Sequence, residues 1–174
     1  EDFTEQIDLL TDRYSRPPVR NPGRRLCVRC FGPFSARPQE DGAVSIRWKT
    51  AKAEELFALL IHHRGKAISK EYLIETLWPG LDPQKSDNLF HVTCSYLRAA
   101  LADAAAPSLL QREPDGYRLN MECIDCDLDH FCIGAADCRD TQTLESVAAF
   151  YSGEYLAAKP YEWASAARTK LESE

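Results

Sequence analysis

Cysteine is the residue type in this chain whose number and spacing most directly suggest chemistry. The 174 residues include seven cysteines, and two pairs have Cys-x-x-Cys spacing, Cys27 with Cys30 and Cys123 with Cys126. Four thiolates can complete the tetrahedral shell of a zinc ion, so a zinc-dependent structural or redox switch is one hypothesis. Cys27 and Cys30 lie in an apparent strand, however, where residues three apart point to opposite faces. We therefore expect buried apolar thiols and no cofactor.

The other reactive residue types form no catalytic pattern. The sequence contains no His-Glu-x-x-His, Gly-x-Ser-x-Gly or Gly-x-x-x-x-Gly-Lys motif. His62 and His63 end a predicted helix, where we expect their positive charge to complement the helix C-terminus. The acidic residues of Cys123–Asp140 lack the spacing of a calcium loop and are expected to form a solvated face. The sequence therefore predicts a protein that is not an enzyme.

The net charge of −6 is distributed unevenly along the chain. Arg24–Asn120 carries 14 basic and 11 acidic residues, a net of +3, whereas Met121–Glu174 carries 4 basic and 11 acidic residues, a net of −7. A mild basic excess permits nucleic-acid binding without demonstrating it. No run approaches the roughly 20 apolar residues that cross a bilayer, and the odd cysteine count favours a reducing compartment. We expect a cytoplasmic protein that makes no membrane contact.

Residues 1–23 are expected to form a lead-in helix and a linker. Apolar residues spaced by four, three and four predict an amphipathic helix over Glu1–Tyr14. Three prolines and four arginines in Ser15–Arg25 predict an extended linker. Because the chain begins with Glu rather than Met, we expect it to be part of a longer protein.

The next region predicts a small antiparallel sheet. Leu26–Arg47 contains three strand-like runs, of which the last is Val44–Arg47. Turn dipeptides separate the runs, Gly32-Pro33 first and Asp41-Gly42 second.

Three helices and a hairpin are predicted after these strands. Apolar periodicity indicates helices over Ala51–Arg64 and Lys70–Leu77, whose caps are Thr50 and Ser69, and Gly65 is expected to terminate the first.

A third helix is expected to start at Ser86 or Asp87 and to run to about Ala102. It follows a proline-containing loop, and Leu109–Asn120 then predicts a hairpin with Pro114-Asp115-Gly116 at its tip. This order of elements is that of a winged helix-turn-helix, which makes the fold class α+β, with an N-terminal antiparallel sheet and a C-terminal hairpin wing.

The third helix has two distinct faces. Phe90, Cys94, Leu97 and Leu101 fall on one stripe that we expect to be buried. The opposite side would meet base edges if the helix entered a major groove, with Arg98 as the strongest bidentate donor. The candidate base-contacting residues are Asn88, His91, Val92, Ser95, Tyr96, Arg98 and Ala99.

Basic residues around this helix are candidates for phosphate contacts. Lys70, Lys85 and the helix N-terminus near Asp87 are expected to hold phosphates. Arg112 and Arg118 on the hairpin are expected to approach the minor groove or the backbone. Glu113 and Asp115 beside them would repel phosphate, so we expect modest, salt-dependent affinity.

Residues 26–174 resemble a known family of regulators. The segments FGPF, KAEELFALL, SKEYLIETLW, SYLRAAL and GYRL are similar to the OmpR-type winged helix of the Streptomyces antibiotic regulatory protein family. The acidic tail resembles the start of that family's bacterial transcriptional activator domain, a helical-repeat module. We therefore expect a winged-helix domain over 24–121 and a truncated helical domain over 122–174. Its predicted helices are Leu128–Ala136, Thr141–Tyr151 and Tyr161–Leu171.

The resemblance implies a regulator that binds direct-repeat promoter DNA as a homodimer. It further implies that the loop Trp78–Ser86 contacts RNA polymerase, and that the chain is the output region of a two-component response regulator. The family often has Arg where Tyr96 stands, and its usual wing lacks the Glu113 and Asp115 pair. An alternative from another class is a protein-interaction module, in which the winged helix is a scaffold and the acidic tail binds a partner.

Overall fold

A computed structural model describes residues 26–40, 43–104, 108–136 and 153–173. The expected helices Glu1–Tyr14 and Thr141–Tyr151 and the expected linker lie outside these residues. The described chain divides into two compact units. Among the described residues, the larger unit comprises those of Leu26 and Ala36–Ile124, and the smaller unit comprises those of Cys27–Ser35 and Asp125–Ser173. The expected domain boundaries near residues 24 and 121 stay a prediction.

The first two predicted helices of the larger unit are present. Helix α2 spans Ala51–His62, and the Thr50 hydroxyl accepts a hydrogen bond from the Ala53 amide at 3.2 Å. The helix ends at His62, two residues earlier than expected, and its C-cap is His63. The backbone turns left-handed already at Arg64, with φ of +47°, so the expectation that Gly65 terminates the helix is wrong. Helix α3 spans Lys70–Leu77 and is capped by Ser69, as the sequence predicts.

Helix α4 spans Pro83–Asp103 and begins earlier than expected. Its N-cap is Asp82, whose carboxylate accepts hydrogen bonds from the amides of Gln84 and Lys85 at 3.1 and 3.2 Å. The prediction that Ser86 or Asp87 caps this helix is therefore wrong. An Asp followed by Pro is itself a helix-start signal, because Pro at the first helical position has the required φ and lacks only an amide that the helix does not use.

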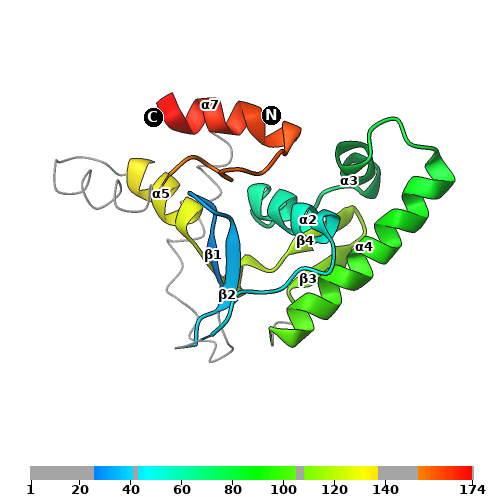
Figure 1. Cartoon of the computed structure of the whole chain (residues 1–174), viewed down its shortest axis with the longest axis horizontal. Helices are drawn as coiled ribbons and strands as arrows, with labels where there is room; N and C mark the ends of the chain where they lie inside the picture. The colour runs from blue at the N-terminus through cyan, green and yellow to red at the C-terminus, as the bar shows by residue number, and fades with distance from the viewer. Residues whose placement is uncertain (1–25, 41–42, 105–107, 137–152, 174) are drawn as a thin grey trace. The chain divides into compact units, whose positions relative to one another are not determined.

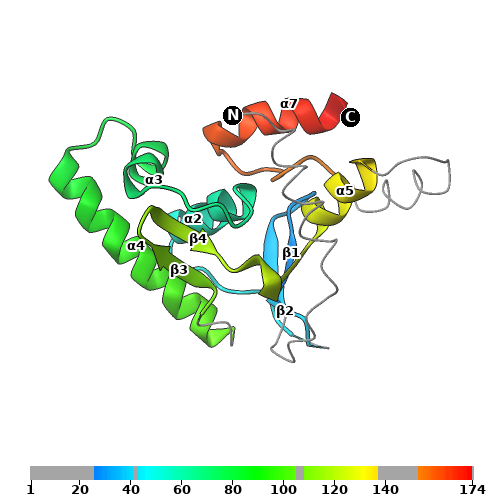
Figure 2. The ribbon, with the colours of Figure 1, turned by 180° about the vertical axis from the view of Figure 1, so that it is seen from behind.

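The β-hairpin consists of β3, Leu110–Glu113, and β4, Gly116–Leu119. Its register pairs Glu113 with Gly116, so the connecting loop is Pro114-Asp115 and Gly116 opens the return strand. Tyr117 and Leu119 are both buried on one face of the hairpin. Helix α2 contacts α3, α4 and β4, which gathers the three helices and the hairpin into one body (Figures 1 and 2).

The N-terminal strands differ in part from the prediction. Strands β1, Leu26–Arg29, and β2, Ser35–Pro38, join β5, Ile124–Cys126, in a three-stranded sheet of order β2-β1-β5. The expected strand over Val44–Arg47 does not form. The Ile46 amide donates one hydrogen bond to the Ala36 carbonyl of β2 at 2.7 Å, but no ladder forms, and the Val44 side chain is 74% exposed. Alternation alone does not make a strand, and the third strand of this sheet is instead β5, which follows the short helical turn Met121–Cys123 and pairs with β1.

The smaller unit contains helices α5, Asp127–Ala136, and α7, Ser165–Ser173. The first agrees with prediction to within one residue, whereas a 3₁₀ turn, Glu162–Ala164, replaces the start of the last predicted helix. The Phe31 ring packs edge-on against Phe131, with ring centroids 5.1 Å apart. Among the described helices, none has the length and apolar character needed to cross a membrane.

Candidate nucleic-acid interface

The buried stripe of α4 anchors the helix to the rest of the larger unit. Phe90, Cys94, Leu97 and Leu101 are each at most 2% exposed, as the periodicity predicts. Burial raises the pKa of the Cys94 thiol to about 11, which keeps it protonated at neutral pH. Because the side chains on this stripe are locked by packing, the opposite side of the helix is held in a defined orientation.

The opposite side of α4 is open within the larger unit. Val92 is 46% exposed although it is apolar, and the Tyr96 side chain is half-buried. At 100° per residue, Asn88, Ser95 and Ala99 lie along the centre of this side. The exposed candidate residues are Asn88, His91, Val92, Ser95, Arg98 and Ala99. We call these six residues together with Tyr96 the α4 face.

The corrected start of α4 changes one expected phosphate site. Asp87 lies in the second turn of the helix, so the helix N-terminus that we expected beside it is instead at Pro83. The Asp82 carboxylate occupies two of the amides there, which leaves them unavailable to a phosphate. Lys85 is exposed in the first turn and remains a candidate for a phosphate contact. The loop before α4 is correspondingly shorter and runs from Trp78 to Asp82.

Lys70 belongs to a charged cluster at one edge of the α4 face. Its ammonium group forms an ion pair with Asp87 and lies 3.3 Å from His91 Nε2. The hydrogen bond from Lys70 holds the pKa of Asp87 below its usual value, so this carboxylate stays ionised. Asp87 therefore neutralises part of the positive charge that Lys70 would present to a phosphate. The sequence pattern did not reveal this ion pair.

Lys49 lies at the other edge and was not among the predicted residues. Its ammonium group is 4.1 Å from the centre of the Tyr96 ring, within the range of a cation–π contact. Lys49 is exposed and immediately precedes the cap of α2. The signal available in the sequence was a basic residue directly before a helix start, a place where phosphates often bind. The contact with Tyr96 places Lys49 next to the α4 face.

The two arginines of the hairpin have different surroundings. Arg112 is exposed and stands opposite Tyr117 across the ladder. Arg118 forms an ion pair with Glu113, with Nε 2.9 Å from Oε1. The acidic residue expected to repel phosphate is thus the partner of Arg118, which leaves Arg112 as the stronger candidate for a backbone or minor-groove contact.

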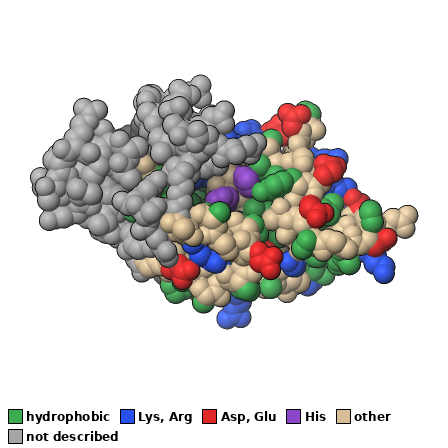
Figure 3. Space-filling model, turned by 90° about the horizontal axis from the view of Figure 1, so that it is seen from above, with side chains coloured by type: hydrophobic (Ala, Val, Ile, Leu, Met, Phe, Trp, Pro, Cys, Tyr) green, Lys and Arg blue, Asp and Glu red, His purple; other side chains and the backbone are tan. Residues whose placement is uncertain are grey.

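The described surface shows no single basic patch on the face in Figure 3. Lys and Arg side chains there are interspersed with Asp and Glu. This agrees with the net charge of only +3 in residues 24–120.

His62 and the cysteines do not take the roles considered from sequence. Burial, followed by repulsion from His63 and Arg64, lowers the pKa of His62 to about 4, so His62 is neutral at pH 7 and cannot supply charge to the end of α2. Among the described residues, Cys30 and Cys126 come together with Asp127, while Cys27 and Cys123 do not join them. The four-thiolate zinc shell is therefore not assembled.

Comparison with known proteins agrees with this architecture. Residues 47–119 match the family described as transcriptional regulatory protein, C terminal. The chain is similar in fold to a solved structure of Mycobacterium tuberculosis EmbR in complex with a low-affinity phosphopeptide, with a TM-score of 0.69 and 22% sequence identity. The similarity covers 86% of this chain and 42% of that chain, so the present chain spans less than half the length of that structure. No curated protein matches the chain.

Three packed helices, an exposed face on the third and a following hairpin define the winged-helix class of DNA-binding domains. Residues 47–119, which are less than half of the chain, match the model of the transcriptional regulatory protein C-terminal family, and the larger unit has the winged-helix fold of that class. This agrees with the resemblance to the Streptomyces antibiotic regulatory protein family that the sequence segments carry.

Proposed function

We propose that the chain binds promoter DNA in a sequence-specific manner by placing the α4 face in a major groove. The observation that carries the proposal is an exposed, mostly uncharged side of α4 backed by a stripe that is almost completely buried. Arg98 is the residue of this side best suited to a guanine, and Val92 and Ala99 are suited to thymine methyl groups. Asn88, His91 and Ser95 contribute hydrogen bonds to bases or phosphates.

In this arrangement Lys49, Lys70 and Lys85 contact phosphates beside the groove, and Arg112 of the hairpin reaches the adjacent backbone or minor groove. Arg118 has a weaker role, because its guanidinium group is paired with Glu113. Few cations are involved, so the affinity of one domain is modest and two copies on a direct repeat are needed for tight binding.

The remaining parts of the proposal concern the regulator to which this domain belongs. We infer a cytoplasmic output region of a two-component response regulator that binds DNA as a homodimer. The loop Trp78–Asp82 is the proposed contact with RNA polymerase. The end of α3, directly before this loop, is held by Lys52, whose ammonium group donates a hydrogen bond to the carbonyl of Leu77 at 2.6 Å.

The test is a fluorescence anisotropy titration of the chain with duplexes from the promoter of its own gene and with shuffled duplexes of equal length, at two salt concentrations. We expect a preference for promoter DNA, and Arg98→Ala should weaken promoter binding by roughly fivefold to 100-fold, the cost of one bidentate base contact. Arg37→Ala, which removes an exposed arginine on β2, is the matched control and should change affinity little.

Two results would reject this function. Equal affinity for promoter and shuffled DNA with a flat salt response would favour the protein-interaction module instead. An Arg98→Ala protein that binds the promoter as well as the unsubstituted chain would show that the α4 face does not read the bases.

A further inference from the structure

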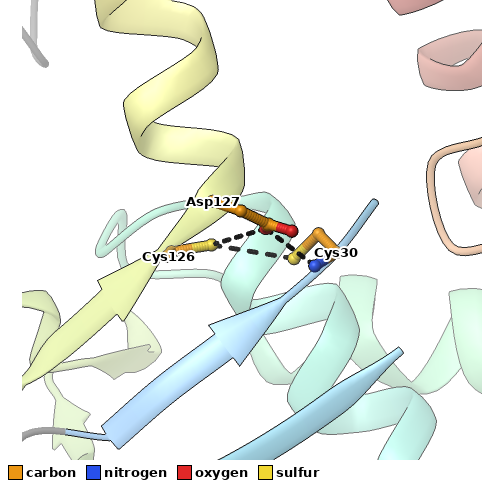
Figure 4. Close-up of side chains that lie close together, drawn as sticks. All are labelled: Cys30, Cys126 and Asp127. Carbon is orange, nitrogen blue, oxygen red and sulfur yellow. Dashed lines mark hydrogen bonds between the residues drawn. The ribbon is translucent and has the colours of Figure 1, made fainter. Parts of the chain in front are cut away.

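Two cysteines that are far apart in the sequence meet inside the smaller unit. Cys30 directly follows the end of β1, and Cys126 ends β5, its neighbour in the sheet. Their sulfur atoms are 3.7 Å apart, and the residues are 0% and 2% exposed (Figure 4). Each is the second member of a Cys-x-x-Cys pair, and the first members, Cys27 and Cys123, are half-buried and lie outside the contact.

Asp127 holds the two segments that carry these thiols. Its carboxylate accepts hydrogen bonds from the amides of Cys30 at 2.7 Å, Phe31 at 3.1 Å and Leu128 at 2.8 Å. The Cys126 sulfur lies 3.9 Å from the same carboxylate. The segment after β1 is thereby fixed against the start of α5, and the two sulfur atoms have little freedom to separate.

This arrangement is poorly suited to a metal ion. Among the described residues the group offers three ligands, two thiols and one carboxylate, whereas a closed structural zinc site takes four. The carboxylate already accepts three backbone hydrogen bonds, which a metal would have to weaken. Two thiols in contact need no further ligand to form a disulfide.

We propose that Cys30 and Cys126 form a redox-active pair that a hydroperoxide converts into a disulfide. This modification site is independent of the proposed DNA binding, because no residue of the α4 face takes part in it. It also differs from the pairing suggested by sequence spacing, since it uses one cysteine from each Cys-x-x-Cys pair.

The reaction proceeds in two balanced steps. One sulfur, as its thiolate, attacks the peroxide: an S–O bond forms, the O–O bond breaks, and the hydroperoxide leaves as an alcohol or water after taking up a proton. The second sulfur then attacks the resulting sulfenic acid, so that the S–S bond forms, the S–O bond breaks and water leaves. Two electrons pass from the two sulfurs to the peroxide. Burial raises the pKa of Asp127, which makes its carboxylate a better acceptor for the proton of Cys126.

The disulfide would close a long loop of chain. Residues 30 and 126 are separated by 96 positions, and the segment between them contains Ala36–Ile124 of the larger unit. Cross-links across long loops restrict the unfolded chain most, so oxidation should raise the thermal midpoint by at least about 5 °C.

The experiment treats the 174-residue chain with hydrogen peroxide after removal of reductant, blocks remaining thiols with N-ethylmaleimide, and maps cross-linked peptides by mass spectrometry. We expect a disulfide-linked peptide that joins Cys30 to Cys126 and disappears on treatment with dithiothreitol. The thermal midpoint should rise at the same time. Cys30→Ala and Cys126→Ala should lose the cross-link, whereas the matched controls Cys27→Ala and Cys123→Ala should keep it.

The cross-linked peptides of the unsubstituted chain identify the disulfide even if an Ala variant fails to fold. Cross-links confined to Cys27–Cys30 or Cys123–Cys126 would overturn the proposal, as would oxidation of other cysteines while Cys30 and Cys126 remain reduced. Stoichiometric zinc in the chelator-free protein, lost in Cys30→Ala and Cys126→Ala, would assign the pair to a metal and would also overturn it.

Discussion

Ile68 and Tyr117 exchange two backbone hydrogen bonds, each 2.9 Å long, which join the turn before α3 to the return strand of the hairpin. The bridge connects the helix-turn-helix to the hairpin through backbone atoms rather than through side chains. The Tyr117 ring also packs edge-on against Phe90 of α4, with ring centroids 5.1 Å apart. The position of the hairpin relative to the helices is therefore set by two independent contacts of one residue, one to the turn before α3 and one to α4.

Gly116 lies next to this bridge, and we predict that no residue with a side chain can replace it without loss of stability. Its φ is +144°, and a Cβ at this position would collide with the Ile68 carbonyl. Gly116→Ala should lower the free energy of unfolding by about 2–4 kcal/mol, through backbone strain and displacement of the bridge. Urea denaturation measures this change. Gly80→Ala is the matched control, because Gly80 also has a positive φ but no atom within 4 Å of a Cβ, and should cost about 1 kcal/mol.

A loss similar in size for both glycine variants would contradict the steric argument. It would show that only the backbone conformation matters, and that the close approach of Gly116 to Ile68 contributes nothing.

His62 is predicted to destabilise the fold as the pH falls. Its pKa is about 4 in the folded chain, below the ordinary 6.5, so the unfolded state binds a proton more readily. This loss of stability is absent above pH 6.5 and grows between pH 6.5 and 4. Below pH 4 it lowers the free energy of unfolding by up to about 3 kcal/mol. Urea denaturation at about pH 7 and about pH 4.5 should show a smaller loss of stability for His62→Gln than for the unsubstituted chain.

Exposed His91 supplies the control for this pH dependence. His91→Gln should leave most of the stability loss between about pH 7 and 4.5 in place. An unchanged pH dependence in His62→Gln would mean that other groups govern the acid sensitivity.

Asp87 is predicted to restrain DNA binding through its ion pair with Lys70. Asp87→Asn removes a negative charge beside the α4 face and frees the Lys70 ammonium group, so affinity for duplex DNA should rise roughly threefold to tenfold at low salt. Stability should hardly change, because exposed ion pairs contribute little. Anisotropy titrations against salt measure the effect, with Asp103→Asn near the end of α4 as the control. Equal gains in both variants would indicate a general charge effect.

Lys49 and Tyr96 are predicted to be energetically coupled. In a double-mutant cycle with Lys49→Ala and Tyr96→Leu, the interaction free energy should be about 0.5–1 kcal/mol, as for other exposed cation–π contacts. Lys49→Ala should also reduce the salt slope of DNA binding by about one, because one phosphate contact is lost. Additive effects on stability together with an unchanged salt slope would remove Lys49 from the proposed interface.

Local sequence signals determined the helices and the hairpin of this protein. The stripe of α4 follows from spacings of three and four residues, and the caps Thr50 and Ser69 act on amides three residues away. The start of α4 was also encoded locally, by Asp82-Pro83, and was missed because Ser86 and Asp87 offered competing caps. Such features depend on neighbours in the chain, so they can be inferred from the sequence alone.

Contacts between distant residues were decided only by the tertiary structure. Val44–Arg47 has the alternation of a strand yet forms none, whereas Ile124–Cys126 forms one because β1 lies beside it. The pairing of Cys30 with Cys126 likewise depends on which strands are adjacent, and nearby Cys-x-x-Cys spacing suggested other partners. Lys70 meets Asp87, and Lys49 meets Tyr96, only after the helices pack. Which strands pair and which charged groups become neighbours depends on how whole helices and strands pack. A short window of sequence does not contain this information.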